Sequence, residues 1–320
     1  MGVVVDGCPA GLELSLEEIR RELQRDVPDP RIGTGRKEEN AAEILSGVFD
    51  GKTIGTPISI MIPNRDAKSC RYEALKHTLR PGHADYTWRV KYGHVDWRGG
   101  SRASGRECIS RLAAGAVARK LLGLAGVSIA SRVVEMAGVG IEDERSMEAA
   151  VARVLELSAT GESTGGRVKV TTSGLPVGLG EPVFGKLSAE LGAALLGIGA
   201  VKAFELGAGR QHAGMTGSET NDAMIVEGGR LTFASNNAGG TLGGISSGMG
   251  LVVGLTVKPT PSIPLPQKTV DLESGQERTI EVKGRFDRNI TPRVAVVAEA
   301  MTAIVVLDHM IRSGFVHPSR

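Results

Sequence analysis

The chain shows no regular alternation of strands and helices, and this constrains its fold more than any other feature. Gly228-Gly229 and Ser274-Gly275 are turn pairs between strand-like segments, which predicts antiparallel hairpins. A parallel βαβ domain would need a helix after each strand. We therefore expect an α+β fold with antiparallel sheets and no Rossmann domain. No linker or internal repeat divides the 320 residues, so residues 1–320 are expected to form a single domain.

Two capping boxes mark predicted helix starts. Ser15–Glu18 predicts a short helix that ends near Arg25, and Ser104–Glu107 precedes an Ala-rich run that predicts a helix to about Leu122. The other expected elements are strands at Glu43–Phe49, Ile58–Ile62 and Gly165–Thr172, a long loop through His77–Asp85, and a helix at Lys186–Leu196.

The last long apolar stretch is Val294–Ile311, which follows Thr291-Pro292. Three polar residues interrupt it: Glu299, Asp308 and His309. A membrane span is more uniformly apolar, so we expect a packed C-terminal helix that ends at Gly314. No secretory signal opens the sequence. These features predict a cytoplasmic protein with no membrane partner.

Charge and cysteine usage exclude several classes of function. Lys and Arg total 38 against 36 Asp and Glu, a net charge of +2, which argues against a nucleic-acid partner. Nine basic and three acidic residues lie between Arg80 and Lys120, a local positive field suited to an anionic ligand. Cys8, Cys70 and Cys108 have no metal-ligand spacing, so we expect free thiols and no metal site.

Two segments are candidate anion sites. Arg102 and Arg106 flank the predicted helix start at Ser104, where backbone N–H groups and the helix dipole favour a phosphate. An ordinary solvated helix start explains the same pattern. Lys258–Ser262 is a rigid loop with one cation and two hydroxyls, and it suits either a phosphate cradle or a plain turn.

Two titratable residues stand out as candidate catalytic groups. His83 lies in Pro-Gly-His-Ala-Asp between Arg80 and Asp85, whose charges perturb a nearby imidazole. A structural histidine is the alternative. Asp287 precedes the C-terminal helix, and its alternative is a loop carboxylate paired with Arg285 or Arg288.

Taken in order, these segments resemble the chorismate synthase family from end to end. The matching stretches are Val5–Leu12, Ile44–Val48 with Gly51–Thr53, Arg80–Thr87, Arg102–Glu107, Gly178–Phe184, Gly217–Glu219 with Asn221-Asp222, Ser235–Gly248, Lys258–Ser262 and Arg285–Asp287.

The resemblance implies helices sandwiched between antiparallel sheets, and a homotetramer. It implies an enzyme that removes phosphate and a hydrogen from 5-enolpyruvylshikimate 3-phosphate (EPSP) to give chorismate. The cofactor implied is a flavin of the FMN/FAD class, specifically reduced FMN with no net redox change. Reduced flavin lends electron density to expel phosphate and recovers it as the hydrogen departs. Whether NADPH reduces the flavin on this chain or an external flavin reductase does so is left open.

The family's functional positions carry over residue by residue. Its second histidine, which protonates the flavin, corresponds to His83, and its late aspartate, which helps take the hydrogen through the flavin, corresponds to Asp287. Its flavin-contacting positions correspond to Arg102, Ala103, Ser104, Gly199, Ala200, Gly243, Lys258, Pro259, Thr260, Pro261, Ser262 and Arg285. The positions that face NADP or substrate correspond to Arg25, Arg31, Arg36 and Arg106.

The sequence departs from the family in two places. Phe286 replaces a histidine beside Asp287, which we interpret as tuning. The sequence also begins after the family's Gly-Glu-Ser-His-Gly motif, whose histidine protonates the departing phosphate, and we expect a misassigned start codon. The alternatives are a weak or inactive family member that still binds flavin and EPSP, and a different FMN-binding flavoprotein such as a reductase or carrier.

Overall fold

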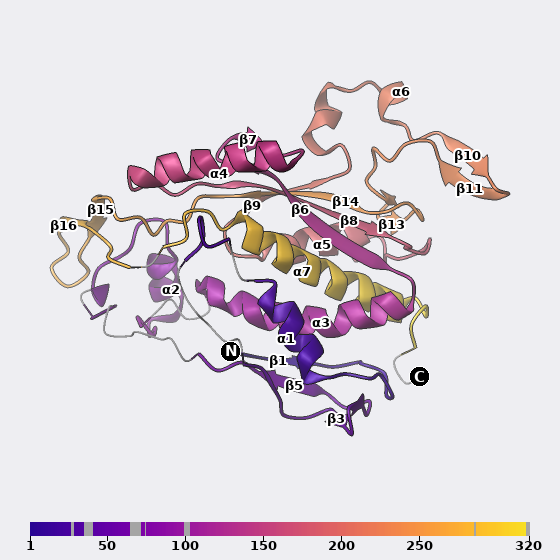
Figure 1. Ribbon diagram of the computed structural model, residues 1–320, viewed down its shortest axis with the longest axis horizontal. Helices are drawn as coiled ribbons and strands as arrows, with labels where there is room; N and C mark the ends of the chain where they lie inside the picture. Colours follow the sequence, from indigo (N-terminus) through magenta and orange to yellow (C-terminus); the bar gives the residue numbers. More distant parts are fainter. Residues whose placement is uncertain are drawn as a thin grey trace.

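A five-stranded antiparallel sheet forms one layer of the structure, a computed structural model (Figure 1). The structure describes residues 1–26, 29–34, 41–64, 72–73, 75–98, 103–284 and 286–317. The strand order is β7-β6-β8-β14-β9. The strands are β6 (Ser128–Met136), β7 (Val139–Gly140), β8 (Gly166–Ser173), β9 (Val201–Leu206) and β14 (Val252–Val257). Alternate side chains of β8 and β14 are buried, because successive residues of a strand point to opposite faces.

A smaller antiparallel sheet lies on the opposite side of the molecule, in the order β1-β5-β2. Its strands are β1 (Gly2–Val5), β2 (Glu43–Ile44) and β5 (Ile58–Met61). All four residues of β1 pair with β5, and the amino group of Met1 donates to the carbonyl of Ile62 at 2.8 Å. The apolar face of this sheet contributes Ile58 and Ile60 to the core.

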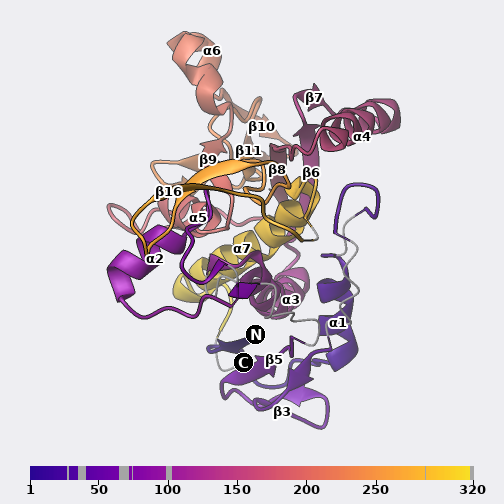
Figure 2. The same ribbon diagram turned by 90° about the vertical axis from the view of Figure 1, so that its left-hand side faces the viewer.

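Helices fill the space between the two sheets. They are α1 (Leu16–Gln24), α3 (Cys108–Leu124), α5 (Leu187–Leu196) and α7 (Thr291–Arg312). α7 packs against α3, α5, β6 and β8, whereas α3 packs against α1 and β1. α4 (Glu144–Ala159) lies on the outer side of the large sheet, against β7 and β6 (Figures 1 and 2). The predicted sandwich of helices between antiparallel sheets is therefore confirmed.

The C-terminal helix α7 has the length and composition of a membrane span, with a mean hydropathy of 1.9 over its most apolar window. In this fold 72% of that window is buried against the rest of the chain. The buried carboxylate of this helix also finds partners inside the protein. Glu299, with only 4% of its side chain exposed, pairs with Arg25 at 2.5 Å and with Arg119. The expectation of a packed helix agrees with this burial.

Within the described part of the chain, four two-stranded hairpins lie outside these two sheets. They are β3 (Val48–Phe49) with β4 (Lys52–Thr53), β10 (Met224–Glu227) with β11 (Arg230–Phe233), β12 (Thr241–Leu242) with β13 (Ile245–Ser246), and β15 (Gln267–Val270) with β16 (Glu277–Ile280). The turns at Gly228-Gly229 and Ser274-Gly275 join two of them, as predicted. β10, β11 and the short helix α6 (Gly217–Thr220) extend away from the sandwich (Figure 1).

Local predictions were wrong at three places. Glu43–Phe49 forms two short strands because Ser46 turns the chain, donating to the Pro57 carbonyl at 3.0 Å. No helix was predicted after the loop at His77–Asp85, but α2 (Asp85–Tyr92) begins at the last residue of that loop. Ser104 caps a 3-10 turn (Gly105–Glu107) and not α3 itself. The Glu107 carboxylate accepts from Arg111 at 2.9 Å instead of completing a capping box.

Gly115 sets how closely α3 approaches α7. A Cβ on Gly115 would lie 2.4 Å from the Cβ of Ala300. We therefore expect Gly115→Ala to overpack the core and to lower the free energy of unfolding by about 1–3 kcal/mol in urea unfolding. The matched control is Gly123→Ala on the same helix, where the new Cβ would meet no atom within 4 Å. This control should leave stability unchanged or raise it by up to ~1 kcal/mol. Equal effects of the two substitutions would contradict the close packing.

Candidate active site

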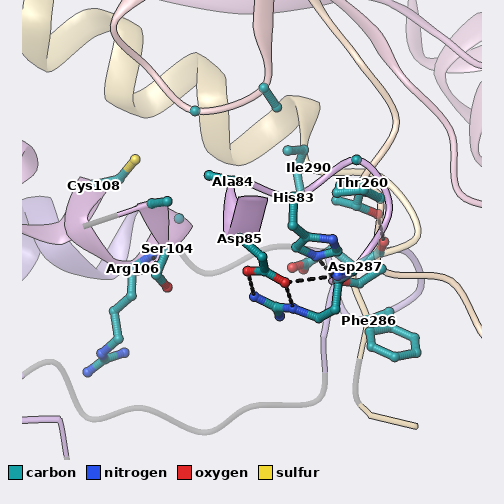
Figure 3. A pocket seen from close by; sticks show the side chains of 18 of the residues that line it. His83, Ala84, Asp85, Ser104, Arg106, Cys108, Thr260, Phe286, Asp287 and Ile290 are labelled. Atoms are coloured by element: carbon teal, nitrogen blue, oxygen red, sulfur yellow. Dashed lines mark hydrogen bonds and ion pairs between the residues drawn. The ribbon is translucent and has the colours of Figure 1, made fainter. Parts of the chain in front are cut away.

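A cavity of about 540 Å³ opens at the N-terminal end of α7. Among the described residues, its lining includes the loop at 80–85 with α2, the turn at 103–108, residues 198–202, the loop at 258–262 and residues 286–297, together with smaller contributions such as Asp26, Thr34 and residues 95–97. Figure 3 shows Ser104 and Arg106 on one side of this cavity, and His83 and Asp287 on the other. The volume lies within the usual range of small-molecule sites.

Most of the residues predicted to form a site line this one cavity. They include both candidate catalytic groups, His83 and Asp287. The others are Ala103, Ser104, Arg106, Gly199, Ala200, Lys258, Thr260, Pro261 and Ser262. These residues come from five separate parts of the sequence, so the fold, and not their spacing along the chain, gathers them.

Four predicted site residues lie elsewhere. Arg25 pairs with Glu22 and Glu299, and Arg31 pairs with Asp29 at 2.7 Å and Glu148 at 2.8 Å, so carboxylates of this chain neutralise both cations. Gly243 lies in the β12–β13 turn, and Pro259 lines a second cavity together with Gly165. Arg36, Arg102 and Arg285 fall outside the described residues.

His83 is held at both ring nitrogens. Nδ1 lies 3.0 Å from the Pro81 carbonyl oxygen, and Nε2 lies 2.8 Å from the Ser262 hydroxyl. Burial lowers the pKa of His83, and the positive charge of Arg80 lowers it further. An unperturbed histidine titrates near pH ~6.5. His83 is therefore a neutral imidazole at neutral pH, with one nitrogen that can donate and one that can accept.

Asp287 sits where three chain segments meet. Its Oδ1 accepts from the backbone N–H of Thr34 at 3.0 Å, and its Oδ2 lies 3.8 Å from Nη1 of Arg293. Arg293 is itself fixed by two hydrogen bonds to Asp26, at 3.1 and 2.6 Å. The Thr260 hydroxyl donates to the Asp287 backbone carbonyl at 2.9 Å. These contacts hold the carboxylate in one orientation at the cavity wall.

Arg80 and Asp85 form a forked ion pair at the start of α2, with Nε–Oδ2 and Nη2–Oδ1 distances of 2.8 Å. Burial raises the pKa of Asp85, but the hydrogen bonds and charge of Arg80 outweigh it, and the net pKa is lowered. Because the pKa of this carboxyl is lower in the folded protein, the ion pair stabilises the fold at pH values above the ordinary carboxyl pKa of about 3.9. This stabilisation is lost as the pH falls through the lower pKa of the folded state. The pair thus anchors α2, which has no buried residue.

The cavity lining combines cations with aromatic and aliphatic side chains. Lys202 and Lys258 line it and make no ion pair within the described ranges. Trp88 and Trp97, the two tryptophans of the chain, line it together with Ile198. Such a site suits a ligand with a planar ring and anionic groups.

Cys108 also lines the cavity, but it does not have the character of a nucleophile. Burial, followed by the negative charge of Glu107, raises the pKa of Cys108 to about 12. A thiol with that pKa stays protonated at neutral pH, whereas the reactive form of cysteine is the thiolate.

Sequence reasoning missed several residues that line the cavity. They are Asp26, Arg293, Lys202 and both tryptophans. Asp26 and Arg293 are far apart in the sequence, and no local pattern indicates their pairing. The tryptophans did carry a usable signal. Both lie in the basic stretch between Arg80 and Lys120, and aromatic side chains within a cationic segment are typical of a site for a ring-bearing anion.

Comparison with known proteins gives one consistent family. The family model described as chorismate synthase matches residues 1–311. A chorismate synthase from Methanosarcina mazei is 48% identical, with 99% of this chain and 93% of the relative covered. One from Archaeoglobus fulgidus is also 48% identical, with 99% and 93% covered. A solved structure entitled "Crystal Structure of Chorismate Synthase" superposes with a TM-score of 0.77 at 30% identity, covering 98% of this chain and 88% of that one.

Proposed function

The chain belongs to the chorismate synthase family, and from that premise we propose that the cavity beside His83 and Asp287 binds reduced FMN together with EPSP. The reaction of this family is the 1,4-anti elimination of phosphate from EPSP to give chorismate, a carbon–oxygen lyase reaction. It is the last common step toward the aromatic amino acids. The observation that supports the proposal most strongly is that His83, Asp287 and the loop at 258–262 line one cavity.

The residues of the cavity fit a bound flavin. Trp88, Trp97 and Ile198 offer apolar surface to a flat ring system, and Lys258 offers a cation to a phosphate. At Gly105 and Gly199 an added Cβ would meet no atom within 4 Å, so the backbone there is open to close approach. Reduced FMN, when bound, would supply the electron density that helps the phosphate of EPSP to leave.

The polar groups of the chain would then bind the substrate and handle protons. EPSP carries two carboxylates and a phosphate, and Arg106 and Lys202 are cavity-lining cations suited to such groups. We assign proton transfer to His83, through Nε2, and proton acceptance to the Asp287 carboxylate, which Arg293 and Thr34 orient.

The finer assignments follow the family. We propose a homotetramer in the cytoplasm, with reducing equivalents from NADPH or from an external flavin reductase. Sedimentation velocity would test the assembly. Anaerobic reduction of the FMN-loaded protein by NADPH, with and without a reductase, would separate the two electron sources.

Binding of both ligands in one cavity is tested by flavin spectra. EPSP added anaerobically to the protein loaded with reduced FMN should perturb the flavin absorbance in a saturable way. Shikimate, which lacks both the phosphate and the enolpyruvyl group, serves as the control ligand and should cause little change. A spectrum that does not respond to EPSP would favour a different flavoprotein.

Lys258→Ala should weaken FMN binding, because the side chain is a cation in the proposed phosphate cradle. A charge-assisted hydrogen bond contributes roughly 1.5–3 kcal/mol, which corresponds to about a 10- to 100-fold rise in Kd. The rise should shrink at high salt, where charges are screened over a few ångströms. Quenching of Trp88 and Trp97, which line the cavity, reports the Kd. Lys268→Ala, an exposed lysine on β15, is the control. Unchanged FMN affinity at low salt would place the cradle elsewhere.

A further inference from the structure

Two loops are joined directly beneath the imidazole of His83. Nζ of Lys258 donates to the Gly82 carbonyl at 3.1 Å. A Cβ added to Gly82 would lie 2.7 Å from the Cβ of Pro261, so the Gly82 backbone packs directly against the Pro261 ring. The third link is the contact of 2.8 Å between Nε2 of His83 and Oγ of Ser262. The loop at 258–262 therefore packs against the histidine loop as well as lining the cavity.

The contact at Nδ1 of His83 determines whether Nε2 donates or accepts a hydrogen bond. Nδ1 lies 3.0 Å from the Pro81 carbonyl oxygen, and a carbonyl oxygen only accepts hydrogen bonds. Nδ1 must therefore carry the hydrogen. A neutral imidazole has one donor and one acceptor nitrogen, so Nε2 presents its lone pair to the Ser262 hydroxyl. Burial and Arg80 keep the pKa of this ring low, which favours the neutral form.

The other charged groups that face His83 form hydrogen bonds with partners other than its ring. Arg80 and Asp85 bind each other through two hydrogen bonds of 2.8 Å, and Lys258 points at the Gly82 carbonyl. Among the described residues, Ser262 is the side chain that contacts Nε2, and it also lines the cavity. A hydroxyl both donates and accepts. It can serve a neutral ring and a protonated ring without any movement of the ring.

We propose that Ser262 is a positioning residue for His83. Its hydroxyl donates to Nε2 of the neutral ring and accepts from the same nitrogen when the ring is protonated. The ring can therefore gain or lose a proton at Nε2, passed through the Ser262 hydroxyl that also lines the cavity, while its orientation stays fixed. This role of Ser262 rests on the proposed function. The family resemblance links the loop at 258–262 to the flavin alone, and the contact with His83 adds a second role.

The first test is spectroscopic and needs no ligand. Protein labelled with ¹⁵N at histidine is examined by solid-state NMR, with His83→Gln used to assign the signals. We expect Nδ1 of His83 to be protonated and Nε2 to be unprotonated but hydrogen-bonded. In Ser262→Ala the Nε2 resonance should move toward that of a bare ring nitrogen, and in Ser262→Thr it should stay near the wild-type position. A hydrogen on Nε2 in the wild-type protein would overturn the proposal.

The second test is kinetic. At saturating FMN and EPSP, kcat of Ser262→Ala should fall by about ten-fold, the upper end of what one neutral hydrogen bond contributes. KM for EPSP should change little, and Ser262→Thr should restore kcat. If Ser262→Ala weakens FMN binding and leaves kcat at saturation unchanged, Ser262 is only a cofactor ligand and the proposal fails. If the NMR pattern holds but the wild-type chain does not turn over EPSP, the proposed function fails instead, and the hydrogen bond remains established.

Discussion

Asp287→Asn should reduce EPSP turnover by roughly 10²–10⁴-fold, the usual contribution of a group that transfers a proton. The amide has the shape of the carboxylate but is a far weaker proton acceptor. Its oxygen can still accept from the Thr34 N–H, and Arg293 keeps its two hydrogen bonds to Asp26. The fold and the binding of FMN and EPSP should therefore remain close to those of the wild type. Single-turnover measurements with reduced FMN would show the loss directly.

The matched control is Asp308→Asn. Asp308 lies toward the far end of α7, pairs with Arg312 at 2.9 Å, and has 59% of its side chain exposed. Exposed ion pairs contribute little to stability, so this variant should turn over EPSP at the wild-type rate. A single-turnover rate for Asp287→Asn within a few-fold of the control would reject Asp287 as the proton acceptor.

His83→Gln should cause a loss of similar size, roughly 10²–10⁴-fold in kcat. Glutamine can form hydrogen bonds to the Pro81 carbonyl and to Ser262, as the imidazole does, but it cannot gain and lose a proton near neutral pH. FMN affinity, followed by tryptophan quenching, should change only slightly. The defect should therefore appear in kcat, with little change in KM.

His94→Gln is the control that shows whether replacing a histidine outside the cavity also lowers kcat. His94 is exposed and does not line the cavity, although it follows α2 closely in the sequence. Its substitution should leave kcat unchanged. If His83→Gln instead raises KM for EPSP and preserves kcat, then His83 binds the substrate and does not transfer a proton.

The sequence predicted those parts of the fold that depend on local chemistry. Gly228-Gly229 and Ser274-Gly275 specify tight turns whatever surrounds them, and Ser15 caps α1 through its own neighbour Glu18. α2 was missed for a physical reason. None of its residues is buried, so it has no apolar stripe, and an ion pair at its start holds it in place.

The candidate site was predictable only in part. The position of His83 between glycine and charged residues suggested a perturbed imidazole, but its partner Ser262 lies far away in the sequence. The family resemblance assigned Arg25 and Arg31 to ligand binding, although both are satisfied by carboxylates that no sequence pattern connects to them. Pairings between distant residues are decided by the packing of the layers, and a single sequence does not encode them locally.

We propose that this chain converts EPSP to chorismate in the cavity beside His83 and Asp287. The most direct test is anaerobic incubation of the protein with photoreduced FMN and EPSP, with chorismate and released phosphate measured together. We expect equal amounts of the two products, many turnovers per FMN, and a flavin that is still reduced at the end. Absence of chorismate while EPSP and reduced FMN are both bound would show that this chain does not catalyse the reaction.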